Sequence, residues 1–146
     1  TAMGYQALDT LTTQSFNVAI GSGALGANNQ SANTAIGHNA AHNASSAANL
    51  VCIGTDAGNA ITTGSSNTIV GRNAGTSITT GTNNSFLGAA AGSGAANSTS
   101  NNVILGNSSI STLRCQTQTI SGLSDRRDKT AIEDLIVGLD FINTLS

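Results

Sequence analysis

Large side chains and charges are scarce in this chain. Of its 146 residues only 3% are aromatic and 8% are charged, and proline is absent, whereas glycine occurs 17 times. An ordinary globular domain needs many more large apolar side chains to fill its core. A chain of this composition can bury apolar area only by stacking backbone closely against backbone, or against further copies of itself. We therefore expect it to form oligomers.

The charge balance excludes several kinds of partner. A net charge of −2 provides no basic surface for nucleic acid or for a membrane. The sequence has no apolar run long enough to cross a bilayer, and no charged N-terminal region followed by an apolar stretch. We expect no nucleic-acid partner, no membrane insertion and no signal peptide.

Residues that could bind metals are few and isolated. Cys52 and Cys115 lack the spacing of metal ligands, and we interpret both as small buried side chains that do not form a disulfide. His38 and His42 fall in a Gly/Ala/Asn-rich connection without a third ligand, which indicates solvated loop residues. Calcium-binding coils need an aspartate in each repeat, and only Asp56 occupies such a place. No metal or other cofactor is expected.

A short motif recurs seven times. Each copy has a β-compatible run that ends in an apolar residue, then a glycine, then a small residue three positions later. The glycines follow one another at intervals of 17, 16, 17, 17, 17 and 18 residues. They are Gly4, Gly21, Gly37, Gly54, Gly71, Gly88 and Gly106, and the small residues are Ala7, Ala24, Ala40, Ala57, Ala74, Ala91 and Ser109.

We predict an all-β fold, in which residues 1–106 form a repetitive β-solenoid or β-roll that serves as a trimeric shaft with rungs of 16–18 residues. No rung can bury its aliphatic face alone, but stacked rungs pair each strand with those above and below it. At about 4.8 Å per rung, seven rungs give a rod of roughly 30 Å.

Two sets of side chains are expected to stack from rung to rung. The asparagine that opens most copies, Asn49 in the fourth, should form a ladder. The apolar residues before the glycines should be buried in the core of the chain or of a trimer. They include Ile36, Ile53, Val70 and Leu87.

Paired threonines suggest another function, in which a monomeric polar solenoid binds ice or carbohydrate. The pairs are Thr12-Thr13, Thr62-Thr63 and Thr79-Thr80. Adjacent residues of a strand point to opposite faces, so each pair would place only one threonine on a given face. This alternative is disfavoured, and a monomeric mass in solution would support it.

The repeats resemble those of two families of fibrous proteins. Their Ala-Ile-Gly cores are similar to the head repeats of trimeric autotransporter adhesins and to the shafts of bacteriophage tail fibres. Both families are homotrimers, so the resemblance implies a homotrimer. The usual adhesin-head unit is shorter than 16–18 residues, and the repeats alone do not choose between the families.

The end of the chain has a different composition. Only Asp9, Asp56 and Arg72 are charged in residues 1–113, whereas nine charged residues lie in the remaining 33. Six consecutive residues, Ser124-Asp125-Arg126-Arg127-Asp128-Lys129, contain five of them. The repetitive shaft is expected to end before this segment.

This segment resembles the start of the C-terminal intramolecular chaperone of phage tailspikes, tail fibres and neck appendages, including the endosialidase spikes. The family motif is Ser-Asp-x-Arg-x-Lys, which Ser124, Asp125, Arg127 and Lys129 match. The resemblance implies autoproteolysis between Ser124 and Asp125, with Ser124 and Lys129 as catalytic residues and Asp125 and Arg127 in support. It also implies lead-in strands over 107–124 and a truncated, partly helical chaperone over 125–146.

The implied protein is a virion tail fibre or tailspike. It would assemble in the host cytoplasm, contact other tail proteins and bind a host surface receptor. The alternative is the head of a bacterial trimeric adhesin without peptidase activity.

The motif is chemically reasonable for a self-cleaving site. A lysine near other cations, here Arg126 and Arg127, can lose its proton and act as the base for a serine hydroxyl. Attack by Ser124 on its own carbonyl carbon would close a strained four-membered ring. The motif therefore does not identify the nucleophile. A serine of a neighbouring subunit, a water molecule or help from Asp125 would avoid the strain. Taken alone, the motif also fits a solvated charged turn before a helix.

Overall fold

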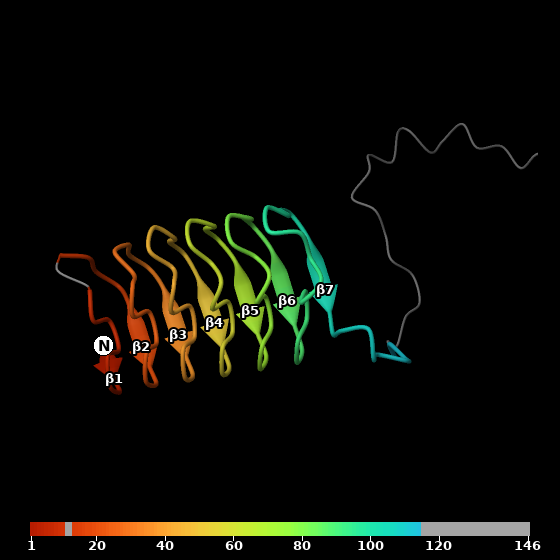
Figure 1. Ribbon diagram of the computed structural model, residues 1–146, viewed down its shortest axis with the longest axis horizontal. Coiled ribbons are helices and arrows are strands. Elements are labelled where there is room, and N and C mark those ends of the chain that lie inside the picture. The colour runs from red at the N-terminus through yellow and green to blue at the C-terminus, as the bar shows by residue number, and fades with distance from the viewer. Residues whose placement is uncertain (11–12, 115–146) are drawn as a thin grey trace, which may run out of the picture. The chain divides into compact units, whose positions relative to one another are not determined.

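The computed structural model describes residues 1–10 and 13–114. Seven strands form one parallel sheet in chain order and wind into a β-solenoid of about 6 turns (Figure 1). No helix occurs in these residues, which confirms the predicted all-β solenoid. The strands are β1 (Ala2–Met3), β2 (Val18–Ile20), β3 (Thr34–Ile36), β4 (Val51–Ile53), β5 (Thr68–Val70), β6 (Ser85–Leu87) and β7 (Val103–Leu105).

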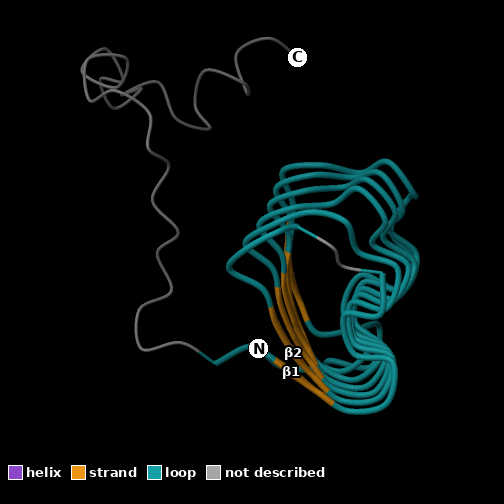
Figure 2. Cartoon of the chain, turned by 90° about the vertical axis from the view of Figure 1, so that its left-hand side faces the viewer, coloured by secondary structure: helices purple, strands orange, loops and turns teal. Residues whose placement is uncertain are grey.

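Each strand lies in register with the next, so that one copy of the sequence motif makes one turn. The central residue of β4, Cys52, pairs with Ala35 of β3 and with Ile69 of β5. A view along the coil shows the strands stacked on one side and the loops closing each turn (Figure 2). We call the turn that begins with the residue directly before β2 rung 2, and number the other rungs in the same way.

The central residue of each three-residue strand, β2 to β7, points into the coil. Neighbouring side chains of a strand point to opposite faces, so the residues on either side of it face outward. We call the central residues the inner column. Those of rungs 2 to 6 are at most 1% exposed: Ala19, Ala35, Cys52, Ile69 and Phe86. Ile104 of β7 is half-buried.

The glycine after each strand is required by the close approach of neighbouring rungs. Gly54 has a φ of +129°, and a Cβ atom added to it would lie 2.7 Å from the carbonyl carbon and oxygen of Gly71. Any side chain at this position would push the two rungs apart.

A second position in each turn, six residues after the inner-column residue, also belongs to the core. In rung 2 it is the buried Leu25, after Ala19. In rung 5 it is Gly75, where an added Cβ would lie 2.6 Å from Cδ1 of Ile69. Both positions have positive φ. The pairs along the coil are Ala19/Leu25, Ala35/Ala41, Cys52/Gly58, Ile69/Gly75 and Phe86/Gly92.

An asparagine ladder runs beside the sheet, but Asn49 is not part of it. The residues directly before β2 to β7 are Asn17, Asn33, Leu50, Asn67, Asn84 and Asn102. Oδ1 of Asn33 accepts a hydrogen bond from the Leu50 N–H at 2.9 Å. The prediction is therefore wrong in rung 4, because strand pairing sets the register and places the buried Leu50 where the other rungs have asparagine. Asn49 lies one residue earlier and is exposed.

Thr1–Thr112 form one compact unit, which contains the whole described coil. The expected lead-in segment, 107–124, lies partly outside the described residues, and the expected chaperone segment, 125–146, lies wholly outside them.

Candidate functional site

The residue directly before each glycine faces outward, and together these residues form an unbroken apolar column on the sheet. We call it the outer column. It consists of Met3, Ile20, Ile36, Ile53, Val70, Leu87 and Leu105. Ile53 is 36% exposed, Leu87 is 55% exposed and Met3 is 66% exposed. The chain itself leaves a continuous stripe of apolar side chains accessible.

The outer column corrects part of the sequence prediction. Ile36, Ile53, Val70 and Leu87 do not lie in the core of the chain, because the neighbouring central residues occupy it. In a pair such as Ala35-Ile36 the larger residue is the natural choice for a core, and the structure places it outside. The burial of these four residues between copies of the chain stays a prediction.

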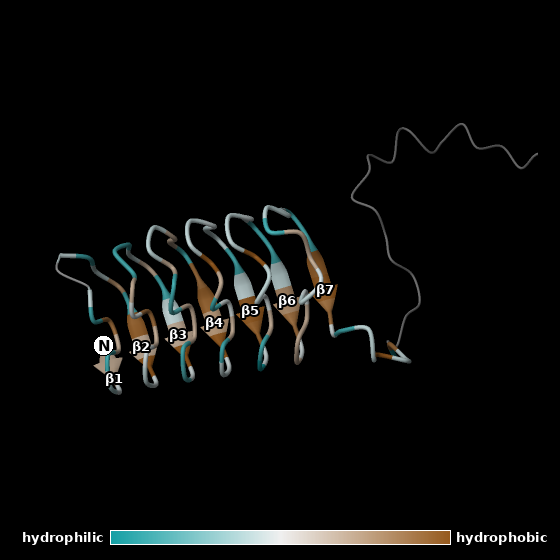
Figure 3. Cartoon of the chain, in the orientation of Figure 1, coloured by the Kyte–Doolittle hydropathy of each residue, from teal (hydrophilic) through white to brown (hydrophobic). Residues whose placement is uncertain are grey.

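The surroundings of the outer column are neutral. The strand residues two positions earlier face the same way and are a mixture of valine, threonine and serine: Val18, Thr34, Val51, Thr68, Ser85 and Val103. No strand in the described residues carries a charged side chain. Figure 3 shows the hydrophobic colour recurring from strand to strand. Contact through this face would bury no charge, and burying an unpaired charge is the most costly event at an interface.

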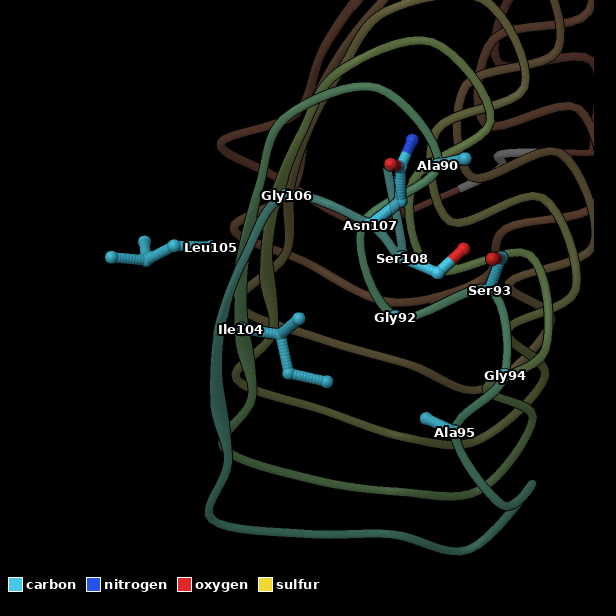
Figure 4. Close-up of a pocket in the computed structure, with 10 residues that line it drawn as sticks. All are labelled: Ala90, Gly92, Ser93, Gly94, Ala95, Ile104, Leu105, Gly106, Asn107 and Ser108. Carbon is cyan, nitrogen blue, oxygen red and sulfur yellow. The ribbon is translucent and has the colours of Figure 1, made fainter. Parts of the chain in front are cut away.

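The described coil is open at β7. A hollow of about 530 Å³ lies there, between residues of the sixth turn and the segment from Ile104 to Ser108 (Figure 4). Ile104 extends toward the hollow, whereas Leu105 points away from it. The inner column is therefore only partly covered at this end.

Cys52 is a core residue. It is fully buried in the inner column, and burial raises the pKa of its thiol to about 12. The reactive form of cysteine is the thiolate, which burial disfavours here, and the side chain is not accessible to solvent. The buried position predicted for Cys52 is confirmed. Cys115 lies outside the described residues, so the predicted absence of a disulfide stays a prediction.

The two histidines have different environments. His38 is exposed, as expected for a solvated loop residue. His42 is half-buried, and its Nδ1 lies 2.7 Å from the carbonyl oxygen of Gly23 in the preceding rung. A Cβ atom added to Gly26 would lie 2.6 Å from the His42 ring. His42 thus helps to join two rungs, which its position in a polar connection did not indicate.

The described part of the chain holds no cluster of histidine, cysteine or acidic residues that could bind a metal ion. Within residues 1–10 and 13–114 there is also no helix that could span a membrane. The four residues predicted to act in autocleavage all lie outside the described residues. They are Ser124, Asp125, Arg127 and Lys129.

Two features of the site region could not be found from residue types alone. The inner column ranges in size from Ala19 and Ala35 to Ile69 and Phe86, so residue size alone does not show which strand residues face outward. The open end could not be found in this way, because it depends on the path of the chain after Gly106. Comparison with protein-family models, with curated proteins and with solved structures gives no match to this chain.

Proposed function

We propose that this chain is part of a homotrimeric phage tail fibre or tailspike, and that the coil is its shaft. The observation that carries the proposal is the outer column. Side chains with the exposures of Ile53 and Leu87, repeated over seven rungs, present on the order of several hundred Å² of apolar surface. Continuous apolar patches of this size mark interaction sites in soluble proteins.

A parallel trimer suits this column because its residues repeat at the spacing of the rungs. Three copies placed around a three-fold axis would bring identical columns together, rung against rung, in a closed ring of contacts. Ile36, Ile53, Val70 and Leu87 would then be buried between chains. The apolar area would leave water without the desolvation of a charge.

The resemblance of the charged segment to the tailspike chaperone supports the second part of the proposal. The net reaction is hydrolysis, in which the peptide bond between Ser124 and Asp125 breaks and water supplies a hydroxyl group to the Ser124 carbonyl and a proton to the Asp125 nitrogen. Lys129 accepts a proton from the nucleophile as the base. Arg127 stabilises the oxyanion or holds Asp125. The released chaperone would have driven trimer formation, and the mature fibre would bind a host surface receptor.

A bacterial trimeric adhesin head is the second candidate. It would use the same coil and the same outer column, and it would have no self-cleavage. The separating observation is therefore a new C-terminus at Ser124.

The test uses a chain that includes the whole downstream chaperone. Mass spectrometry should detect cleavage between Ser124 and Asp125, and light scattering should give the mass of a trimer. Ser124→Ala and Lys129→Ala should each leave an uncleaved trimer, whereas the control Ser121→Ala should cleave normally.

Each part of the proposal can fail separately. Normal cleavage of the Ser124→Ala variant, or a mature C-terminus elsewhere, would contradict the peptidase assignment. A trimer that never cleaves would favour the adhesin head. A monomeric mass would contradict both candidates and would favour the solenoid that acts alone.

A further inference from the structure

Phe16 combines two features that are unfavourable in a single chain. Its side chain is 87% exposed, the highest exposure among the large apolar residues that the structure describes. Its backbone has a φ of 64°, in the left-handed region that bulky residues rarely adopt. Backbone strain of this kind is typical of positions that serve a function outside the stability of the chain itself.

The left-handed backbone at Phe16 belongs to the coil. The residues two positions before β2 to β7 all have a φ between 55° and 64°, and we call them the entry column. The coil bonds this column from rung to rung, since the Ser66 N–H donates to the Ala48 carbonyl of the preceding rung at 3.0 Å. Asparagine tolerates this conformation best among the larger residues and occurs three times. The entry column consists of Phe16, Ala32, Asn49, Ser66, Asn83 and Asn101.

Phe16 widens the apolar surface of the outer column at β2. Exposure alternates along this part of the chain, because Asn17 and Ala19 are buried whereas the residues between and beside them are accessible. Phe16 therefore continues the outward positions of Val18 and Ile20. These three residues form a row without a polar or charged side chain.

The apolar surface narrows toward the other end of the coil. At β6 the equivalent row is Asn83, Ser85 and Leu87, of which only Leu87 is apolar. Parallel copies would bring each row against its equivalent, so the row at β2 would meet another fully apolar row. Antiparallel copies would place it against the more polar rows near β6. The gradient favours a parallel contact with a second copy of the chain.

We propose that Phe16 anchors the contact between copies, and that its ring packs against the apolar row at β2 of the neighbouring chain. The inference rests on the proposed function, because it takes a second copy of this chain as the partner. A covered aromatic side chain removes on the order of 150–250 Å² from water, and a trimer holds three such rings at one level of the coil. A few well-packed residues carry most of the binding free energy of an interface, and aromatic residues are frequent among them.

Phe16→Asn gives this position the residue that the entry column has before β4, β6 and β7. In the single chain it should raise the urea concentration at the midpoint of unfolding, because asparagine suits the left-handed backbone. In the trimer it should raise the protein concentration at which half of the trimers dissociate by about tenfold or more. Light scattering over a dilution series of the 146-residue chain measures this shift. The matched control is Ser66→Asn, at a φ of 61°, which removes no ring and should leave dissociation unchanged.

A tryptophan at the same position reports the contact directly, because the chain contains no other tryptophan. The emission of Phe16→Trp should move to shorter wavelength as the trimer forms, since the indole ring leaves water. In the control Thr80→Trp, the indole lies in an exposed turn and should keep the emission of a solvated ring.

The outcomes separate this inference from the proposed function. If the unsubstituted chain is a trimer and Phe16→Asn dissociates at the same protein concentration, Phe16 is not the anchor although the trimer remains. An emission of Phe16→Trp that does not change on association would overturn the inference in the same way and would leave the ring free for a receptor. A monomeric mass of the unsubstituted chain at every concentration would contradict the proposed trimer itself, and the inference with it.

Discussion

Rungs 2 and 3 pair their strands in the same register as rungs 5 and 6, but the strand residues that fill their interiors differ in size. In the first two rungs the strand supplies alanine, and the turn supplies Leu25 or Ala41. In the other two the strand supplies Ile69 or Phe86, and the turn supplies glycine. Strand and turn residues six positions apart therefore share one volume within each rung. The pairs Ala19/Leu25, Ile69/Gly75 and Phe86/Gly92 each combine one large and one small residue, as expected for a densely packed core. The pair of rung 3, Ala35/Ala41, is small at both positions.

The largest loss of stability is expected when the strand residue and the turn residue six positions later are both large. In rung 6, Gly92→Leu would place a Cβ atom 2.7 Å from the Phe86 ring and a bulky residue at a φ of +70°. Overpacking and the left-handed backbone together should lower the free energy of unfolding by about 4 kcal/mol. Urea titration measures the change.

The double variant Phe86→Ala with Gly92→Leu reproduces the pair of rung 2 and should recover about half of the lost stability or more. Gly94→Leu is the matched control, because an added Cβ there meets no atom within 4 Å. Additive effects of Phe86→Ala and Gly92→Leu would contradict the shared volume.

The next largest effect is expected on the association of chains, when a residue of the outer column is replaced by a charged one. Leu87 is 55% exposed, so Leu87→Asp should change the stability of the single chain by less than about 1 kcal/mol. In a trimer the same aspartate would be an unpaired charge between chains and should weaken association by about 3 kcal/mol. Light scattering over a range of concentrations measures the shift.

Thr80→Asp adds the same charge to an exposed turn and should keep the trimer. If Leu87→Asp also keeps it at every concentration, the outer column is not the contact between copies.

A smaller effect is expected from the asparagine ladder, which distinguishes rung 5 from rung 4. The buried Asn67 donates to the carbonyl oxygens of Gly64 and Gly81 and accepts from the Asn84 N–H at 2.9 Å. Asn67→Ala leaves these groups buried without their partner and should cost about 2 kcal/mol in urea titration. Asn43→Ala removes bonds of an exposed asparagine to Asn59 and should cost about 0.5 kcal/mol or less. Equal losses of unfolding free energy in the two variants would mean that burial of the asparagine ladder does not contribute to stability.

The sequence predicted the coil well because its strongest signal is steric. A glycine that must approach the next rung cannot be replaced, so Gly54 and its equivalents mark every turn and determine the number and order of the strands. It was harder to predict which residues of each strand point into the coil. In Val18-Ala19-Ile20 all three residues are apolar, and only the volume shared with Leu25 selects alanine for the interior.

Residue types alone did not determine the exact register of the asparagine ladder in rung 4. Asn49 and Leu50 are adjacent, and asparagine matched the other copies, but pairing of Val51 with Thr34 places Leu50 on the ladder. The candidate autocleavage residues, from Ser124 to Lys129, stay a prediction from the motif. The described residues form the coil and its outer column, on which the assembly part of the proposal can be tested without the autocleavage residues.

At neutral pH no effect is expected from the thiol of Cys52, which lies between the two kinds of rung, six residues before Gly58. Burial raises the pKa of its thiol from the ordinary value of 9.0 to about 12, so the folded chain holds a proton that the unfolded chain loses above pH 9. The resulting stabilisation is fully present below pH 9 and should fall by about 1.4 kcal/mol per pH unit between about pH 9 and 12. Cys52→Ala, which copies Ala19 and Ala35 of the same column, should lose this slope. The difference between the two urea titrations, repeated from pH 8 to 10.5, isolates the thiol from every other titrating group, and parallel curves would show that Cys52 reaches solvent.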